Sequence, residues 1–191
     1  MKYIHKDDAF TGLEAAIVLI AFVVVAAVFS YVVLGAGFFT TQKSQEVVHS
    51  SVGQSSSSVE LIGDVYGLKD GVNQKIKTIE FSLGLTAGGT VIDMEATTLT
   101  FSDANNYYAL EKTSDVALDS AEWKIIETLN PKVGGDVLEK GEQMIIQVQL
   151  KTDKYLDPNA EFTLEIKPAV GATMGITRTV PAQIDAVNLL Y

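Results

Sequence analysis

The feature that most limits what this chain can fold into is an uncharged apolar run near its N-terminus. From residue 15 to residue 39, 25 consecutive residues carry no charge, and the aliphatic and phenyl side chains are interrupted by Ser30, Tyr31, Gly35 and Gly37. As an α-helix this run is about 38 Å long at roughly 1.5 Å per residue. A helix that is apolar on every side is stable only where lipid or other apolar protein surrounds it.

Three interpretations fit such a run. A cleaved secretory signal would use Lys2 and Lys6 as its basic region, but its apolar core normally has about 7–15 residues, and Gly35-Ala36-Gly37 is a loose substitute for a cleavage site. A permanent membrane anchor fits by length, because the hydrocarbon core of a bilayer is about 30 Å thick. The third interpretation is a polymerisation helix that is held in the membrane first and packed into a filament later.

Glu14 separates the second interpretation from the third. This carboxylate lies at the start of the apolar run, where a lone acid costs several kcal/mol unless it finds a partner, and is therefore a functional candidate. The structural alternative is an interfacial residue that faces lipid headgroups.

The residues before Glu14 favour the filament. Phe10-Thr11-Gly12-Leu13-Glu14 places a glutamate fifth from a phenylalanine, directly ahead of the apolar helix. This segment resembles the class III signal peptides of the type IV pilin and archaellin superfamily. In that family a dedicated peptidase removes a short charged leader, and the mature chain often begins with Phe and has Glu at its fifth position.

The resemblance implies cleavage between Ala9 and Phe10, with Met1–Ala9 as the leader. Family leaders usually end in Gly, often after a basic residue, whereas this one ends in Asp7-Asp8-Ala9. The bond between Gly12 and Leu13 is therefore a competing site. Cleavage there would make Glu14 the second residue and lose the resemblance.

Cleavage also suggests a role for Glu14 in assembly. It creates an α-amino group at Phe10, with a reference pKa of about 7.7–8.0, which is largely cationic at neutral pH. We expect Glu14 of one subunit to pair with this cation on another, because an unpaired buried charge costs about 3–5 kcal/mol. Gly12 and Ala16 add small residues four apart, which allow close approach of helices. Phe10, Gly12 and Glu14 are thus the predicted assembly residues.

Beyond Phe39 the chain becomes polar, and we expect the helix to continue to about residue 50–57. Ser55-Ser56-Ser57-Ser58 then predicts a boundary, either a fraying helix end or a short flexible link. A serine run at a cell surface is also a candidate for O-linked sugar.

The rest of the chain predicts β-structure. Residues 79–85, 97–101, 146–150 and 162–166 alternate between apolar and polar with period two. Further strands are expected at 59–66, 107–112, 123–129 and 175–184, with turns at Gly, Asn, Asp and Pro clusters between them. The predicted fold is α+β, with a long hydrophobic N-terminal helix followed by an antiparallel, immunoglobulin-like β-sandwich.

Composition excludes several functions. Residues 60–191 carry 20 Asp/Glu and 11 Lys/Arg, a balance of −9, which repels polyphosphate and argues against nucleic-acid binding. The histidines are His5 and His49, both outside the β region, and cysteine is absent, so neither a Ser-His-Asp triad nor thiolate catalysis fits there.

Asp103-Ala104-Asn105-Asn106 offers oxygen ligands for calcium, but a turn stabilised by Asx side chains is the simpler interpretation. We expect no enzyme activity, cofactor or metal.

The C-terminal segment, from Pro168 through Arg178-Thr179-Val180-Pro181-Ala182, resembles the corresponding end of methanogen-type archaellins. The two resemblances together imply an archaellin with a leader at 1–9, a polymerisation helix at 10–58 and a surface domain at 59–191. They imply as partners copies of the chain itself, a leader peptidase, and the membrane platform and motor of the archaellum. The precursor would lie in the cytoplasmic membrane and the product in an extracellular filament. The alternatives are an adhesive type IV-like pilin and a membrane-anchored surface binding domain.

Overall fold

The computed structural model describes the backbone of residues 6–115, 117–132 and 134–191, and the side chains in these ranges from Gly12 onward except those of Ser55 and Ser56. The chain divides into two compact units, one that ends at Ser50 and one that spans Ser51–Tyr191.

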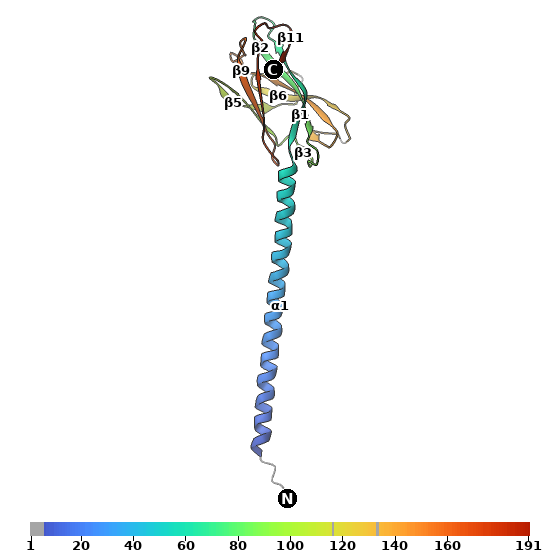
Figure 1. Cartoon of the computed structure of the whole chain (residues 1–191), viewed down its shortest axis with the longest axis vertical. Helices are drawn as coiled ribbons and strands as arrows, with labels where there is room; N and C mark the ends of the chain where they lie inside the picture. The colour runs from blue at the N-terminus through green and yellow to red at the C-terminus, as the bar shows by residue number, and fades with distance from the viewer. Residues whose placement is uncertain (1–5, 116, 133) are drawn as a thin grey trace. The chain divides into compact units, whose positions relative to one another are not determined.

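A single helix, α1 (Lys6–Ser56), contains 51 residues and is continuous through Gly35 and Gly37 (Figure 1). Valine and glycine are weak helix formers, so local propensity alone does not explain this length. At the polar end of the apolar run, the hydroxyls of Thr40 and Thr41 donate to carbonyl oxygens one turn earlier, at 2.8 and 2.9 Å. These bonds satisfy two hydroxyls inside the helix, as is common where water is scarce.

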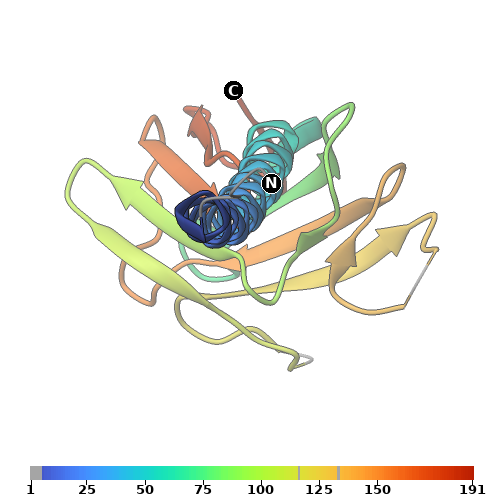
Figure 2. The ribbon, with the colours of Figure 1, turned by 90° about the horizontal axis from the view of Figure 1, so that it is seen from below.

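The second unit is a β domain. Its strands are β1 (Val59–Lys69), β2 (Ile76–Leu85), β3 (Ile92–Asp93), β4 (Thr98–Asp103), β5 (Tyr107–Lys112), β6 (Glu122–Leu129), β7 (Val137–Leu138), β8 (Gln143–Gln149), β9 (Glu161–Lys167), β10 (Met174–Thr179) and β11 (Val187–Leu190). Nine strands form a sheet in the order β10-β9-β4-β5-β6-β8-β2-β1-β11, and β3 pairs with β7 separately. Seen end-on, this sheet is strongly curved (Figure 2).

The curved sheet has two halves that enclose a common core. The halves β10-β9-β4-β5 and β6-β8-β2-β1-β11 are antiparallel within themselves, and they are joined by a short parallel pairing of β5 with β6. Trp123, Phe81, Phe101 and Phe162 are the largest fully buried side chains of the domain. The rings of Phe101 and Phe162 stack with centroids 6.1 Å apart. Burial of aromatic rings supplies much of the stability of a domain of this size.

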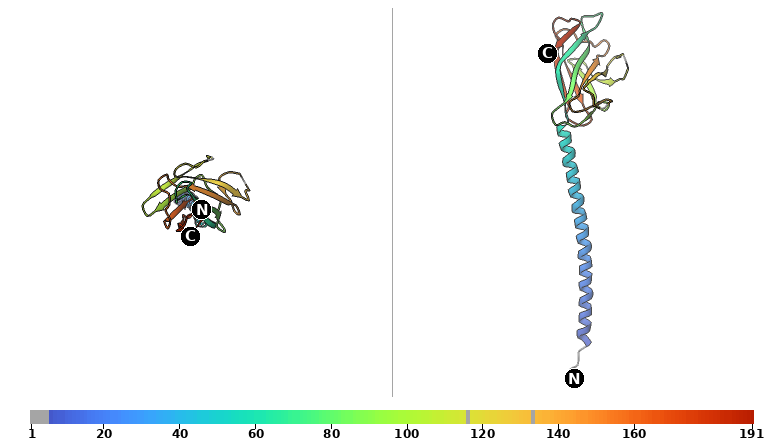
Figure 3. Two further views of the ribbon diagram at one scale, coloured as in Figure 1. Left: turned by 90° about the horizontal axis from the view of Figure 1, so that it is seen from above. Right: turned by 90° about the vertical axis from the view of Figure 1, so that its right-hand side faces the viewer.

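The two end strands of the nine-stranded order meet. Thr179, the last residue of β10, donates its N–H to the carbonyl of Tyr191 at 2.6 Å, and Tyr191 donates back to Thr179 at 3.3 Å. Tyr191 directly follows β11, so this pair links the two ends of the sheet order. The views in Figure 3 show the same strands from two further directions.

The segment Ser57-Ser58 is fixed to loops of the β domain. Ser57 is 1% exposed, its hydroxyl lies 2.6 Å from the carbonyl oxygen of Gly53, and it also hydrogen-bonds the hydroxyl of Thr90. The hydroxyl of Ser58 lies 2.9 Å from that of Thr86. These two serines therefore form neither a fraying helix end nor a flexible link, because their polar groups have found partners within the domain. A buried Ser57 hydroxyl is also inaccessible to a sugar.

Gly171 makes the close approach to Ser57 feasible. Ala172 donates its N–H to the carbonyl of Ser57 at 2.9 Å, and Gly171 has a φ of +122°. A Cβ atom at Gly171 would lie 2.1 Å from the Ser57 carbonyl oxygen. Glycine therefore satisfies both the backbone conformation and the steric requirement at this position.

The expected α+β class is confirmed, and the strands expected from alternation overlap β1, β2, β4, β5, β6, β8 and β9. The strand expected over 175–184 ends at Thr179, because Pro181 has no N–H to continue a ladder. β11 was not expected. Its outward positions carry Val187 and Leu189 while Asn188 is buried, which is the reverse of the usual pattern.

Candidate assembly surface

The large apolar side chains of α1 are exposed to an unusual degree. From Leu13 to Val52 they range from 51% exposed at Val33 to 80% at Tyr31, whereas the core of the β domain buries Val, Leu, Ile and Phe side chains almost completely. Soluble proteins rarely leave large contiguous apolar surfaces open to water, and where such surfaces occur they mark contact with protein or membrane. The exposed apolar side chains of α1 are called the helix surface below.

The helix surface extends around the whole circumference of α1. From Ala15 to Phe39 no charged residue interrupts it, so the helix has no polar side to face water. Within the described residues, α1 is long and apolar enough over Gly12–Gln54 to cross a membrane, by length and composition. Such a surface is stable in two environments, in lipid or packed against other helices of the same kind.

The helix divides the predicted assembly residues between two sides. Positions 10 and 14 are four apart and lie on the same side one turn apart, whereas Gly12 lies on the opposite side with Ala16. Glu14 is exposed, and a Cβ atom at Gly12 would meet nothing within 4 Å. Ala9 and Phe10 belong to the helix by their backbone, but their side chains lie outside the described residues, as do Met1 to His5 of the predicted leader.

The apolar run gives way to a polar end of the helix. Lys43 and Glu46 form an ion pair of 2.8 Å between side chains that are 60% and 68% exposed. His49, with Gln42 and Gln45, lines a shallow groove on the same stretch. Exposed ion pairs of this kind contribute little stability. The groove is lined by polar side chains of a single helix and gives no sign of a binding site.

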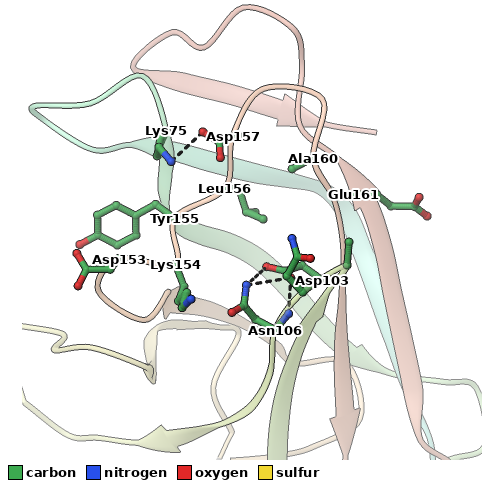
Figure 4. A pocket seen from close by; sticks show the side chains of 12 residues that line it. Lys75, Asp103, Asn106, Asp153, Lys154, Tyr155, Leu156, Asp157, Ala160 and Glu161 are labelled. Atoms are coloured by element: carbon green, nitrogen blue, oxygen red, sulfur yellow. Dashed lines mark hydrogen bonds and ion pairs between the residues drawn. The ribbon is translucent and has the colours of Figure 1, made fainter.

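The turn at Asp103 is the other segment singled out in the sequence (Figure 4). Its carboxylate oxygen Oδ1 accepts hydrogen bonds from the backbone N–H groups of Asn105 and Asn106, both at 2.7 Å, and the Asn106 amide donates to both carboxylate oxygens. These bonds make the Asx-stabilised turn that the sequence predicts, between β4 and β5. Across the pocket in Figure 4, Lys75 pairs with Asp157 at 2.9 Å.

The electrostatics of this turn follow from the same contacts. Burial raises the pKa of Asp103, but the Asn106 side chain, the two backbone N–H groups and the charge of Lys154 together hold it below its ordinary value of 3.8. Burial also raises the pKa of Tyr108, whose oxygen accepts from the N–H of Lys151. Among the described residues, no group of three or more His, Asp or Glu side chains is arranged to hold a metal ion.

Sequence reasoning missed two parts of the β domain. The contacts of Ser57 and Gly171 join residues more than a hundred positions apart, and no local pattern predicts them. β11 was missed because its four residues are too few to give a periodic signal.

Comparisons with known proteins assign the chain to a family. The model of the archaeal-type flagellin family matches residues 9–178. Probable flagellin 1 of Archaeoglobus fulgidus is 42% identical over 204 residues, which cover 100% of this chain and 98% of that protein.

Solved structures agree with this assignment. A structure of the archaeal flagellum of Methanospirillum hungatei strain JF1 matches with a TM-score of 0.73 and 34% identity, over 94% of this chain and 99% of that one. A crystal structure of a flagellin from Methanocaldococcus jannaschii matches in fold, with a TM-score of 0.59 and 18% identity over 69% of this chain and 95% of that one. The chain therefore belongs to the archaeal-type flagellin family.

Proposed function

We propose that this chain is the structural subunit of an archaeal flagellum, a helical filament at the cell surface that serves swimming. The observation that carries the proposal is the family match over residues 9–178, to which the structural match with the flagellum of Methanospirillum hungatei adds support. The exposed apolar side chains of the helix surface also fit a subunit that assembles, because they stay exposed in a single copy. Packing α1 of many copies side by side removes this surface from water and places the acidic β domains outside.

Burial of the helix surface is a large driving force. A fully buried Val, Leu, Ile or Phe side chain stabilises by about 1.5–3 kcal/mol relative to an exposed one. The helix carries many such residues, so a single copy that has left the membrane is unstable in water until its helix packs against others. The family resemblance implies that rotation is driven by a membrane platform and motor, and the chain itself acts as a passive propeller.

Before assembly, α1 holds the precursor in the cytoplasmic membrane. A leader peptidase then cuts between Ala9 and Phe10, and the new α-amino group gives Glu14 of a neighbouring copy a partner. Support comes from the family match, which begins at residue 9, beside the proposed bond. The order of events prevents premature assembly, since the cation does not exist before cleavage.

The N-terminal peptide of filaments sheared from cells tests this proposal by mass spectrometry. Chains that begin at Phe10 support cleavage at the proposed bond, whereas chains that begin at Leu13 move it to the competing bond and make Glu14 the second residue. Chains that keep Met1 and occur only in membranes overturn the filament and favour an anchored surface domain. Rotation of cells tethered by these filaments separates a flagellum from an adhesive pilus.

The role of Glu14 has its own test. Glu14→Ala subunits are expected to be processed normally and to assemble poorly, because the α-amino group of a neighbour is then buried without a partner. Glu46→Ala is the matched control, since it removes an acid of the same helix whose partner, Lys43, lies at the exposed polar end. Normal filaments from Glu14→Ala would show that the carboxylate has no part in assembly.

A further inference from the structure

The apolar run of α1 contains two hydroxyl groups and no other polar side chain. Ser30 and Tyr31 are neighbours in the sequence, and both are exposed in a single copy, Tyr31 to 80%. Phe22, Phe29 and Phe38 present aromatic rings without a hydroxyl on the same run. Apolar burial alone therefore does not explain the phenol at position 31, because phenylalanine would bury the same ring without a polar atom.

The helix that carries Tyr31 leaves its phenol without a partner. The hydroxyls of Thr40 and Thr41 donate to carbonyl oxygens of their own helix at 2.8 and 2.9 Å. Among the described residues, neither the Ser30 hydroxyl nor the Tyr31 hydroxyl has a hydrogen-bond partner. A short serine side chain can turn back to the carbonyl four residues earlier, whereas the rigid ring of a tyrosine holds its oxygen away from its own backbone. Because a buried Tyr O–H normally finds a partner, Tyr31 needs one from another molecule once α1 has left water.

The membrane gives the Tyr31 hydroxyl no partner either. Tyr31 lies eight residues before Phe39, the last residue of the apolar run, which is about 12 Å at roughly 1.5 Å per residue. The Cα–Cβ bonds of an α-helix tilt toward its N-terminus, so this side chain leans toward the middle of the run and away from its nearer end. Tyrosines that anchor membrane helices lie at the lipid–water interface. Tyr31 is too deep for such an anchor, and lipid chains offer no hydrogen-bond acceptor.

A second copy of α1 offers acceptors that lipid lacks. The Ser30 hydroxyl accepts as well as donates, and each backbone carbonyl has a second lone pair. At Gly35 and Gly37 an added Cβ would meet nothing within 4 Å, so a neighbouring helix can approach the backbone there. Consecutive residues lie about 100° apart around a helix, so Ser30 and Tyr31 face different sides. In a helical filament one surface of a copy contacts a different surface of the next, which brings the phenol of one side to acceptors of the other.

We propose that the Tyr31 hydroxyl of one copy hydrogen-bonds an oxygen acceptor on α1 of a neighbouring copy and thereby fixes the register in which the apolar helices pack. The inference rests on the proposed function, since it requires a homopolymer. Apolar side chains can contact one another in many registers, but a slipped register leaves a phenol buried without an acceptor. Tyr31 is a positioning residue distinct from Glu14, because its hydroxyl carries no charge and needs no cleavage to find a partner.

Tyr31→Phe tests the proposal in cells that make filaments, because it removes one oxygen atom and keeps the ring. We expect the precursor to enter the membrane in the parent amount, and sheared filaments to dissociate about fivefold faster than parent filaments at a fixed temperature. We also expect the layer lines in diffraction patterns of electron micrographs to broaden, because registers that the phenol excludes become accessible. Tyr107→Phe removes an exposed phenol of the β domain and is the matched control, expected to change neither readout.

Tyr31→Phe filaments with the parent dissociation rate and sharp layer lines would overturn the proposal. Faster dissociation with sharp layer lines would overturn the role in register, and an equal effect of Tyr107→Phe would overturn the role of position 31. Less precursor in the membranes of the Tyr31→Phe cells would assign the hydroxyl to membrane insertion instead. If the unmodified chain forms no filaments at all, the proposed function fails and this inference fails with it.

Discussion

Helix α1 and the β domain use the same apolar residue types in opposite ways. Leu19 on the helix is 65% exposed, whereas Leu99 in β4 is fully buried. The β domain buries most of its large apolar side chains within one chain, in a core between the two halves of its sheet. The helix cannot do so, and its stability depends on surroundings that other molecules supply. The comparison shows that one sequence encodes a domain with its own hydrophobic core and a segment that is completed only by membrane or by copies.

The largest effect is expected from a charge in the middle of the helix surface. Val24→Asp would bury an unpaired carboxylate among packed helices, at a cost of several kcal/mol for each subunit. We expect no filaments in electron micrographs of cells with this variant, while the near-ultraviolet circular dichroism of the detergent-solubilised chain stays unchanged. Gln45→Asp, at the polar end of the same helix, is the control. Filaments from Val24→Asp would show that position 24 does not lie in a dry interface.

A comparable disruption of the β domain requires a backbone clash. Gly171→Ala places a Cβ atom 2.1 Å from the carbonyl oxygen of Ser57 at a φ of +122°. We expect the free energy of unfolding of the β domain to fall by about 3 kcal/mol or more. Urea titration followed by Trp123 fluorescence measures this change. Gly134→Ala, where an added Cβ meets nothing, is the matched control and should change stability little.

Glu142 of the β domain and Glu14 of the helix show the same contrast for a charged side chain. Glu142 is 2% exposed, and its carboxylate accepts from the backbone N–H of Lys132 at 2.5 Å and of Glu139 at 2.9 Å. Its acid group is satisfied inside one chain, whereas Glu14 is proposed to find its partner on a neighbour. Glu142→Ala is expected to lower the free energy of unfolding by about 2 kcal/mol, because two partly buried backbone N–H groups lose a charged acceptor. Unchanged stability in a urea titration would contradict this account.

The smallest effect concerns acid stability. Because the pKa of Asp103 is lowered in the folded chain, its carboxylate adds stability above the ordinary pKa of 3.8, and this contribution is lost as the pH falls through the lower folded value. Asp103→Asn should therefore make the unfolding free energy fall less steeply below pH 4. Asn106→Ala should act in the same direction, since it removes the side-chain donor. If both variants and the parent chain lose stability with the same dependence on pH, the Asp103 carboxylate is not a source of this acid sensitivity.

The sequence could predict the parts that depend on local periodicity. The uncharged run and Glu14 at its start indicated the helix and its use, and alternation in 79–85 and 162–166 indicated β2 and β9. β3 and β7 have two residues each, which is too short for a periodic signal. The burial of Ser57 depends on loops near Thr90 and Gly171, and the outward Val187 and Leu189 depend on which face of β11 meets the core. Such features are set by tertiary packing rather than by local pattern.

The pair between Thr179 and Tyr191 has a consequence for a protein that must polymerise by one route only. An unpaired edge strand is a template for adding strands from other chains, and crowding identical β domains along a filament raises their local concentration greatly. Since the two end strands of the sheet order hold each other at this pair, a foreign strand must first break a backbone contact that already exists. The half-buried Arg178 beside it adds a charge that an incoming strand would have to accommodate. At this pair the two edge strands are therefore closed to an incoming strand, while the helix remains free to associate.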